Sequence, residues 1–184
     1  MQLSILNKLG DKIVLDSDFI SKIIQSLNMP HDSRILDIGT GWGKMAILLA
    51  LHGYNVITGE PNKWAEWENN AKIAGVFEKI NYQRIDAQKL DFSDGNFDYV
   101  FLLGSLHHIP DKDRVFNEIL RVLTQEGKII LFDYTKKRIE QISKNSPYHP
   151  PAVHPRSILN SLSVSYQYII DDKNEIFCFL IEKN

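Results

Sequence analysis

The regular alternation of β-rich and helical segments most constrains the fold of this chain. Short apolar runs such as "RILDI" (34–38) and "FDYVFLL" (97–103) have the composition of buried strands. The segments between them place apolar residues at helical spacing. Strands that alternate with helices of this length form parallel βαβ units, so the sequence predicts an α/β fold. The predicted strands are 34–38, 54–59, 79–85, 97–103 and 128–132, and the predicted helices between them are 43–53, 62–75 and 111–123, the last closed by "QEG".

The two ends of the chain depart from this alternation. An amphipathic stretch over 11–29 predicts one helix before the first strand. After the fifth strand, the proline-rich "SPYHPPAVHP" predicts a loop, followed by a short helix around "RSILNSL". Two β-rich runs, 164–170 and 175–181, flank "DDKN", which predicts a hairpin. The sheet is therefore expected to end in an antiparallel pair.

Composition excludes several classes of protein. The chain has 184 residues, of which 43% are hydrophobic and 24% charged, as in an ordinary soluble domain. Its formal net charge of −2 provides no general attraction to DNA or to an anionic membrane. No run approaches the roughly 20 apolar residues that span a bilayer, and the N-terminus does not resemble a signal peptide, so a cytoplasmic location is expected. The single cysteine, Cys178, excludes an internal disulfide and a thiolate metal site and is expected to be a buried apolar residue.

A glycine-rich turn, "ILDIGTGWGK" (35–44), lies between the first strand and the next helix. Backbone amides in such a turn, together with the helix N-terminus, can face a ligand. The dinucleotide pattern G-x-G-x-x-G fails because position 44 is lysine. The P-loop pattern fails because Met45 provides no hydroxyl after that lysine. A tight turn without a ligand also accepts glycine, so the glycines alone do not decide the function.

Three acidic residues stand at or near the carboxyl ends of successive strands. They are Asp37, Glu60 and Asp86. In an open parallel sheet this edge binds ligands, and an acid roughly 20 residues after the glycines can accept hydrogen bonds from a ribose. Any one of them alone is more typical of a helix cap or a solvated loop. Their matching positions predict one ligand site.

With these features, the chain resembles the class I S-adenosylmethionine-dependent methyltransferases, and within them the small type 11 group. "LDIGTGWG" is similar to the family motif (D/E)-x-G-x-G-x-G, and "FDYVFLLGSLHHIPD" resembles the fourth-strand motif. "LTQEGKIILFDY" resembles the fifth-strand segment, with Glu126-Gly127 in place of a double glycine, a departure that affects a turn. The resemblance covers about residues 33–134, and the terminal hairpin in outline. It implies a Rossmann-like three-layer sandwich with a mostly parallel seven-stranded sheet that ends in an antiparallel hairpin.

The resemblance also implies the cofactor and its contacts. Glu60 matches the acid that binds the ribose of S-adenosyl-L-methionine, and Pro61 flanks the adenine. Asp86 matches the acid that contacts the adenine amino group. Asp37 would hold the methionine end, although it could equally cap the glycine turn. The expected cofactor-binding residues are Asp37, Gly39, Thr40, Gly41, Gly43, Glu60, Pro61, Asp86, Ala87 and Leu103. The whole chain, 1–184, is expected to be one methyltransferase domain, with an N-terminal helix (11–29), a cofactor-binding core (33–134) and a substrate-side loop, helix and hairpin (145–184).

The methyl acceptor is less constrained. The fourth strand ends in "LLGSLHH" and not in the Asn/Asp-Pro-Pro-Tyr/Phe motif of many base and amide methyltransferases, which argues against DNA and less firmly against RNA. His107 and His108 are expected at the methyl end of the cofactor, where one could act as a general base. In the alternative reading, one orients backbone and the other only packs. His149 and His154 lie in the proline-rich loop, but no H-x-E-x-x-H-type spacing supports a metal site, so no metal is expected.

That loop and the N-terminal helix are expected to form the wall of the substrate site. With no extra domain for a large partner, a small molecule is the first expectation for the acceptor and a protein group the second. The acceptor atom is left open. Two other functions also remain: a cofactor-binding module without catalysis, such as a regulatory subunit, and a nucleotide-dependent oxidoreductase whose fingerprint has changed.

Overall fold

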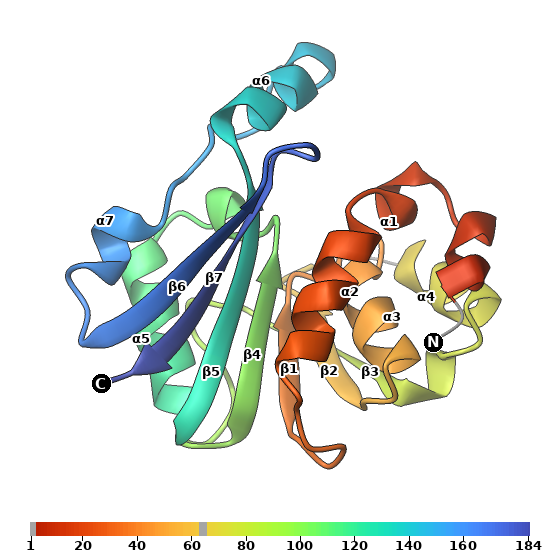
Figure 1. The fold of residues 1–184 in the computed structure, drawn as a ribbon. Coiled ribbons are helices and arrows are strands. Elements are labelled where there is room, and N and C mark those ends of the chain that lie inside the picture. Colours follow the sequence, from red (N-terminus) through yellow and green to blue (C-terminus); the bar gives the residue numbers. More distant parts are fainter. Residues whose placement is uncertain (1–2, 63–65) are drawn as a thin grey trace. The chain divides into compact units, whose positions relative to one another are not determined.

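The computed structural model describes residues 3–62 and 66–184 (Figure 1). Contacts between residues divide the chain into two compact units, Met1–Asp86 and Ala87–Asn184. The boundary falls between the third and fourth strands, inside the predicted core of 33–134. The assignment of the whole chain to a single domain therefore stays a prediction, and the two units are described separately.

The first unit contains three parallel strands. They are β1 (Ile35–Ile38), β2 (Val56–Glu60) and β3 (Ile80–Arg84), in the order β3-β2-β1. Helix α3 (Lys44–Leu51) joins β1 to β2 and is buried nearly all round, as its apolar composition predicts. Helix α4 (Glu66–Ile73) and the 3-10 turn η2 (Phe77–Lys79) join β2 to β3. The predicted helix over 62–75 is present from Glu66, and its residues 63–65 lie outside the described residues.

The predicted single helix over 11–29 is wrong. The chain forms a 3-10 helix η1 (Leu3–Lys8), then α1 (Asp11–Val14) and α2 (Ser17–Ser26). Asp16 separates α1 from α2 because its backbone takes a left-handed conformation, with φ +69°. The Lys44 ammonium donates to the Leu15 carbonyl at 2.7 Å and lies 3.7 Å from Asp16 Oδ2. These contacts come from a helix that is distant in the sequence, so local periodicity did not reveal the break.

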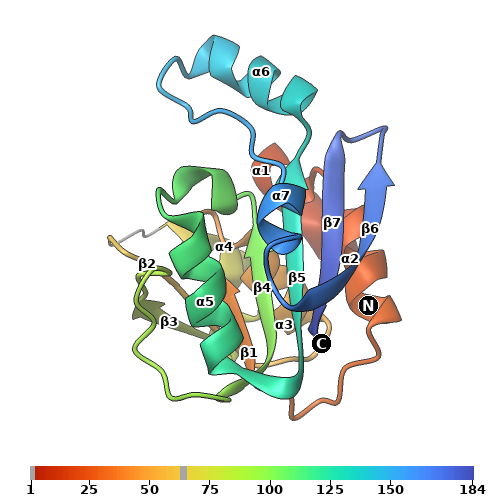
Figure 2. The same cartoon turned by 90° about the vertical axis from the view of Figure 1, so that its left-hand side faces the viewer.

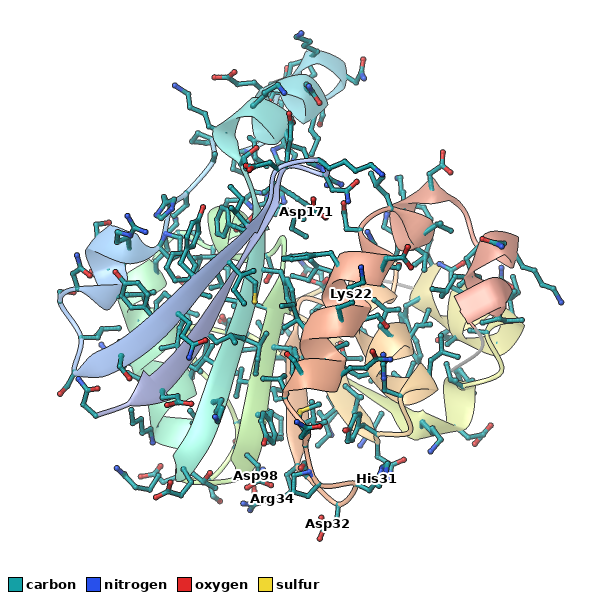
Figure 3. The ribbon with its side chains drawn as sticks, in the orientation of Figure 1. Lys22, His31, Asp32, Arg34, Asp98 and Asp171 are labelled. Carbon is teal, nitrogen blue, oxygen red and sulfur yellow. The ribbon has the colours of Figure 1, made fainter. Side chains whose placement is uncertain are left out.

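The second unit contains four strands in the order β4-β5-β7-β6. Strand β4 (Phe97–Leu103) is parallel to β5 (Leu123–Tyr134), and β7 (Ile176–Lys183) is antiparallel to both β5 and β6 (Val164–Asp171). The predicted hairpin is thus confirmed. Figure 3 shows Asp171 at its tip, where the carboxylate accepts the backbone N–H of Lys173 at 3.1 Å and of Asn174 at 3.3 Å.

Helical segments connect these four strands. Helix α5 (Lys112–Val122) lies along one face of β4 and β5, whereas α6 (Lys136–Asn145) extends past the end of β5 (Figure 2). A 3-10 turn, η3 (Leu106–His108), follows β4, and the short α7 (Arg156–Leu159) precedes β6. The sequence predicted that "QEG" closes the helix before a strand at 128–132. Instead α5 ends at Val122 and β5 begins at once, because Leu123 already pairs with Phe97 of β4.

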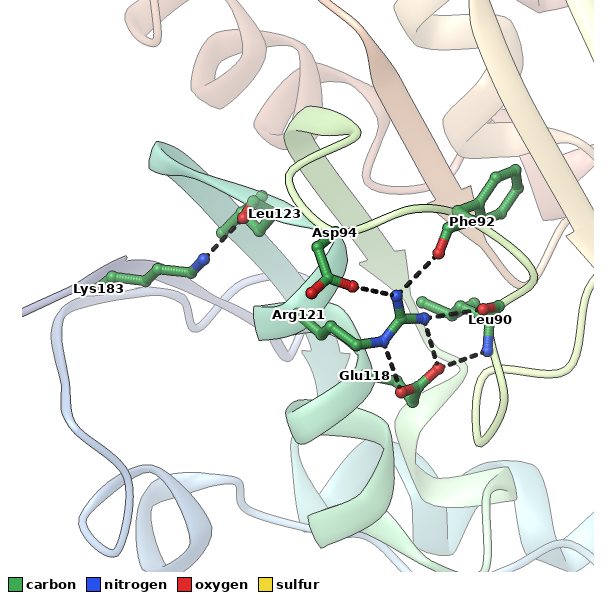
Figure 4. Close-up of polar contacts among 7 residues, drawn as sticks. All are labelled: Leu90, Phe92, Asp94, Glu118, Arg121, Leu123 and Lys183. Carbon is green, nitrogen blue, oxygen red and sulfur yellow. Dashed lines mark hydrogen bonds and ion pairs between the residues drawn. The ribbon is translucent and has the colours of Figure 1, made fainter.

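Arg121 on α5 ties the segment that leads into β4 to the helix (Figure 4). Its guanidinium donates to the carbonyls of Leu90 and Phe92 at 2.9 and 2.8 Å. It also donates to Glu118 at 2.9 Å and to Asp94 at 2.8 Å. One arginine thus satisfies two loop carbonyls that no strand or helix pairs, and orders the approach to β4.

Buried apolar side chains of the strands and of α5 form the core of the second unit. The fully buried rings of Phe101, Phe116 and Phe132 come from β4, α5 and β5. Cys178 on β7 is also buried, as predicted, and burial raises the pKa of its thiol. Among residues 3–62 and 66–184, no helix combines the length and the apolar character that a membrane crossing requires.

Candidate functional site

The glycine turn of the first unit begins directly after β1. Gly39, Gly41 and Gly43 all have positive φ, at +95°, +50° and +87°. A side chain at Gly43 would press on Trp67 and Ile47, at 3.1 and 3.2 Å from its β-carbon. A β-carbon at Gly41 would meet nothing within 4 Å. Gly43 is therefore needed for packing between helices, whereas the backbone at Gly41 is open to a ligand.

Glu60 ends β2 beside this turn. Its Oε1 accepts the backbone N–H of Gly41 at 2.7 Å. The carboxylate is half-buried, and burial raises its pKa while the Gly41 hydrogen bond acts in the opposite direction. The structure thus brings together two residues that the sequence predicted for one site.

Asp37 lies on β1 below the turn and is fully buried. Its Oδ2 accepts the hydroxyl of Thr58 at 2.8 Å, and the Thr58 oxygen lies 2.8 Å from that of Thr40. Its Oδ1 has no hydrogen-bond partner among the described residues. Burial raises the pKa of Asp37 to about 8, against the Thr58 hydrogen bond and with the help of the Glu60 charge.

Thr58 was not predicted as a site residue. It stands directly opposite Asp37 in the β1–β2 register. The pairing of Thr58 with Asp37 could have identified it as a site residue. That pairing depends on the register of β1 and β2, which the sequence does not show.

The other predicted cofactor contacts divide between the units. Glu60 and Arg84 are register partners at the carboxyl ends of β2 and β3, and Asp86 follows two residues later, exposed at that end. Pro61 is exposed next to Glu60, and its carbonyl accepts the Arg84 Nε–H at 3.0 Å. Ala87 and Leu103 belong to the second unit, where Ala87 is buried and Leu103 ends β4.

The loop that enters the N-terminal end of β1 carries another histidine. Figure 3 shows His31 and Asp32 in the loop that enters β1 from α2. The His31 ring stacks on Tyr54, with 5.7 Å between ring centroids. His31 is therefore placed away from the glycine turn, which follows the other end of the same strand.

A histidine–aspartate pair forms the polar centre of the second unit. His107 Nδ1 lies 2.9 Å from Asp133 Oδ1 and 3.2 Å from Oδ2, and both side chains are 1% exposed. His107 Nε2 is buried and has no hydrogen-bond partner among the described residues. Sequence analysis missed Asp133, although an acid near the end of a strand was the signal that identified Asp37 and Glu60.

Two more histidines gather at this pair. The His108 ring lies 4.3 Å from that of His107, and the His149 ring lies 5.0 Å from both, measured between centroids. Loss of water around part of its ring lowers the pKa of His108 to about 4, and the charges of His107 and His149 act in the same direction. His154 does not join them, because its ring packs against Tyr168 and Phe177 of the hairpin.

A groove of about 530 Å³ runs beside the same cluster. Helix α6 contributes Lys136, Ile139 and Lys144, and the proline-rich loop contributes His149 and Pro151. His149 thus belongs both to the groove and to the histidine cluster. The lining combines the apolar side chains of Ile139, Pro151 and Ala152 with the charged side chains of Lys136, Glu140 and Lys144.

Comparison with known proteins gives consistent matches. A family model described as "Methyltransferase domain" matches residues 36–131, which include the glycine turn, Glu60, Asp86 and His107. A 27-O-demethylrifamycin SV methyltransferase of Amycolatopsis mediterranei is 38% identical over 104 residues, which cover 55% of this chain and 38% of that protein. A ubiquinone/menaquinone biosynthesis C-methyltransferase of Rickettsia prowazekii is 26% identical over 188 residues, which cover 91% of this chain and 75% of that protein.

The chain spans about two fifths of the length of the first curated relatives that it matches (38%, 40% and 41%). Among solved structures, a SAM-dependent methyltransferase of Aquifex aeolicus superposes with a TM-score of 0.72 at 16% identity, covering 98% of each chain. At this identity the likeness concerns the fold. It confirms the predicted Rossmann-like α/β class with a mostly parallel seven-stranded sheet that ends in an antiparallel hairpin.

Proposed function

The chain belongs to the methyltransferase-domain family, and from this membership we propose that it is an S-adenosyl-L-methionine-dependent methyltransferase acting on a small-molecule acceptor. The relatives support the class of acceptor, because those named above are a rifamycin methyltransferase and a quinone-biosynthesis methyltransferase. One of them is an O-methylating and the other a C-methylating enzyme by name, so the acceptor atom is left open. No DNA partner is proposed.

The observation that carries the proposal is the contact between Glu60 and the amide of Gly41. It places a carboxylate at the open point of a glycine turn, where a β-carbon would meet no atom within 4 Å. Asp37 adds a buried carboxylate oxygen that no described residue satisfies. A cationic methionine end would supply a donor to Asp37 Oδ1, and a ribose diol could donate to the Glu60 carboxylate, so the residues fit the cofactor.

Each residue then has a binding role. Glu60 would accept the ribose hydroxyls, and Asp37 with the turn backbone at Gly39, Thr40 and Gly41 would hold the methionine end. Pro61, Asp86, Ala87 and Leu103 are proposed for the adenine side and the rest of the cofactor. When bound, S-adenosylmethionine supplies an electrophilic methyl group on a positively charged sulfonium. The protein's contribution is mainly alignment of the acceptor and exclusion of water.

An acceptor that carries a proton on the reacting atom also needs a base. Of the two predicted histidines, His107 is the better candidate, because Asp133 orients its ring and stabilises the imidazolium that proton uptake creates. His108, with a pKa of about 4, is a weak base near neutral pH. His107 Nε2 is therefore the proposed proton acceptor.

Binding and transfer assays test the proposal in order. Calorimetric titration with S-adenosylmethionine, its demethylated product and NAD should show binding of the first two and none of NAD. The protein is then incubated with methyl-labelled cofactor and a small-molecule extract, and label should appear in a product. Binding without transfer to any acceptor would favour the non-catalytic module, and binding of NAD would favour the oxidoreductase.

A further inference from the structure

Three histidines of the second unit converge on one point although two of them are more than forty residues from the third in sequence. His107 and His108 lie in η3, and His149 lies in the loop after α6. One ligand nitrogen from each can be chosen so that all three lie within 4.8 Å of one another. The grouping combines a buried, an exposed and a half-buried ring.

In two of these rings, a hydrogen bond at Nδ1 leaves Nε2 available as a ligand atom. His107 Nδ1 faces the Asp133 carboxylate at 2.9 Å, and His149 Nδ1 faces the Pro150 carbonyl at 3.0 Å. A carboxylate and a carbonyl both accept hydrogen bonds, so each Nδ1 carries the proton and each Nε2 carries a lone pair. In His107 that Nε2 is buried and without a partner among the described residues.

A ring that is only structural normally uses its buried nitrogens in hydrogen bonds. A metal-ligating histidine instead donates one ring N–H to a carboxylate or carbonyl and directs the other nitrogen at the ion. The Asp133 carboxylate is such an acceptor for His107, and the Pro150 carbonyl is one for His149. We propose that His107, His108 and His149 form a binding site for one divalent transition-metal ion of the zinc class.

The donor set decides the class of ion. Three neutral imidazoles suit Zn²⁺, Co²⁺, Ni²⁺ or Cu²⁺ and not Mg²⁺ or Ca²⁺, which take oxygen ligands. Tetrahedral zinc with Zn–N of about 2.0–2.1 Å holds its ligands about 3.3 Å apart, so the nitrogens must approach one another by about 1.5 Å at most. Exposed His108 and loop-borne His149 can move, whereas Asp133 holds His107.

Three protein ligands leave a fourth position for water or for an oxygen atom of a small molecule. The ion and a proton compete for the same lone pair on His107. With the metal bound, His107 cannot act as the base proposed above, and a metal-bound oxygen would lose its proton more readily instead. The sequence predicts no metal because no H-x-E-x-x-H-type spacing supports one. The experiment below decides between a metal site and a metal-free histidine base.

The test uses the full chain after treatment with a chelator. Titration with Co²⁺, followed by its visible absorption, and calorimetry with Zn²⁺ should each give one ion per chain. His149→Ala removes a direct ligand and should weaken zinc binding by more than 100-fold. Loss of a residue that only hydrogen-bonds to a ligand costs at most about 100-fold. His154→Ala is the matched control, because it lies in the same loop but packs against Tyr168, and it should leave binding unchanged.

Asp133→Asn removes the carboxylate that accepts from His107 Nδ1 and should weaken zinc binding by about 10- to 100-fold. Circular dichroism and the melting temperature without metal identify any variant that fails to fold. If Asp133→Asn does not fold, His149→Ala alone tests the proposal, because the His149 ring is only half-buried and its loss should not unfold the chain. The proposal is overturned if the parent binds no ion, or if His149→Ala binds zinc as tightly as the parent. Cofactor binding is measured separately on the same samples, so failure of the metal site and failure of the methyltransferase proposal are distinguishable.

Discussion

His107 Nδ1 and Asp133 Oδ1 lie 2.9 Å apart, with both side chains buried between the end of β4 and the end of β5. This contact fixes the orientation of the imidazole and leaves Nε2 as its reactive nitrogen. The pair therefore has the form of an oriented base, in which a carboxylate supports the charge that the ring gains. Its proposed role in methyl transfer can be tested directly.

Replacing His107 with asparagine should lower turnover by about 100-fold or more, because a general base contributes at least that much. Affinity for S-adenosylmethionine should change little. The measurement is label transfer to the acceptor found in the screen, with His154→Asn as the control. Loss of cofactor binding would instead assign His107 a structural role. Unchanged turnover in both His107→Asn and His108→Asn would leave alignment as the sole source of catalysis.

Glu60→Ala should weaken S-adenosylmethionine binding by about 10- to 100-fold or more. The carboxylate is expected to make charge-assisted hydrogen bonds to the ribose, each contributing roughly 1.5–3 kcal/mol. The demethylated product has the same ribose and should lose affinity by a similar factor. Glu60→Gln keeps the shape and should show an intermediate loss. Equal affinity of Glu60→Ala and the parent, measured by calorimetry, would show that the ribose assignment is wrong.

The buried Asp37 should make stability fall as the pH rises. Burial raises its pKa from an ordinary 3.8 to about 8, so the native state keeps a proton that the unfolded chain loses between these values. The free energy of unfolding then decreases across this window, by at most about 1.4 kcal/mol per pH unit. Asp37→Asn removes this contribution, so its stability relative to the parent, measured by urea unfolding, should increase from pH 5 to pH 8. A constant difference would contradict the raised pKa.

The same residue makes a prediction about cofactor binding. If Asp37 holds the cationic methionine end, binding lowers its pKa and a proton is released at pH 7. Calorimetry in two buffers of different ionisation enthalpy measures that proton. Asp37→Asn should release none. Release of the same number of protons by the parent and the variant would show that Asp37 is only a cap for the glycine turn.

Arg121→Ala should destabilise the chain by about 1–2 kcal/mol. The change leaves the carbonyls of Leu90 and Phe92 without their donor, and the partial exposure of the guanidinium places the cost at the low end of the usual range. Lys128→Ala is the control, because its ion pair with Glu182 is largely exposed and should contribute less than about 1 kcal/mol. Urea unfolding of both variants gives the comparison. Equal small losses would mean that the loop carbonyls are hydrated once the arginine is removed.

Local chemistry explains what could be predicted from the sequence. The turn at Gly39–Gly43 requires positive φ, and glycine is the residue that adopts it readily. The hairpin needs a short polar turn, which Asp171 provides through its own hydrogen bonds. The alternation of periods sets the order of strands and helices, because a helix and a strand bury their side chains at different spacings. The sequence therefore predicts that the glycine turn and the acid that follows it, Glu60, are neighbours.

Contacts between distant residues explain what the sequence did not reveal. The helix predicted over 11–29 breaks at Asp16, where Lys44 of another helix reaches Leu15 and Asp16. The predicted turn "QEG" is instead part of β5, because pairing with β4 extends that strand back to Leu123. In both places local propensity is weaker than a tertiary contact, and no local pattern records that contact.

The α/β class, the glycine turn and the acid beside it follow from the sequence, because each depends on residues close together in the chain or on a repeated period. Three further relationships are seen only in the folded chain: Thr58 supports Asp37, Asp133 orients His107, and His149 rather than His154 joins the histidine cluster. Those partners are set by strand register and by the path of a loop. Both result from packing of the whole chain, so no spacing in the sequence contains them.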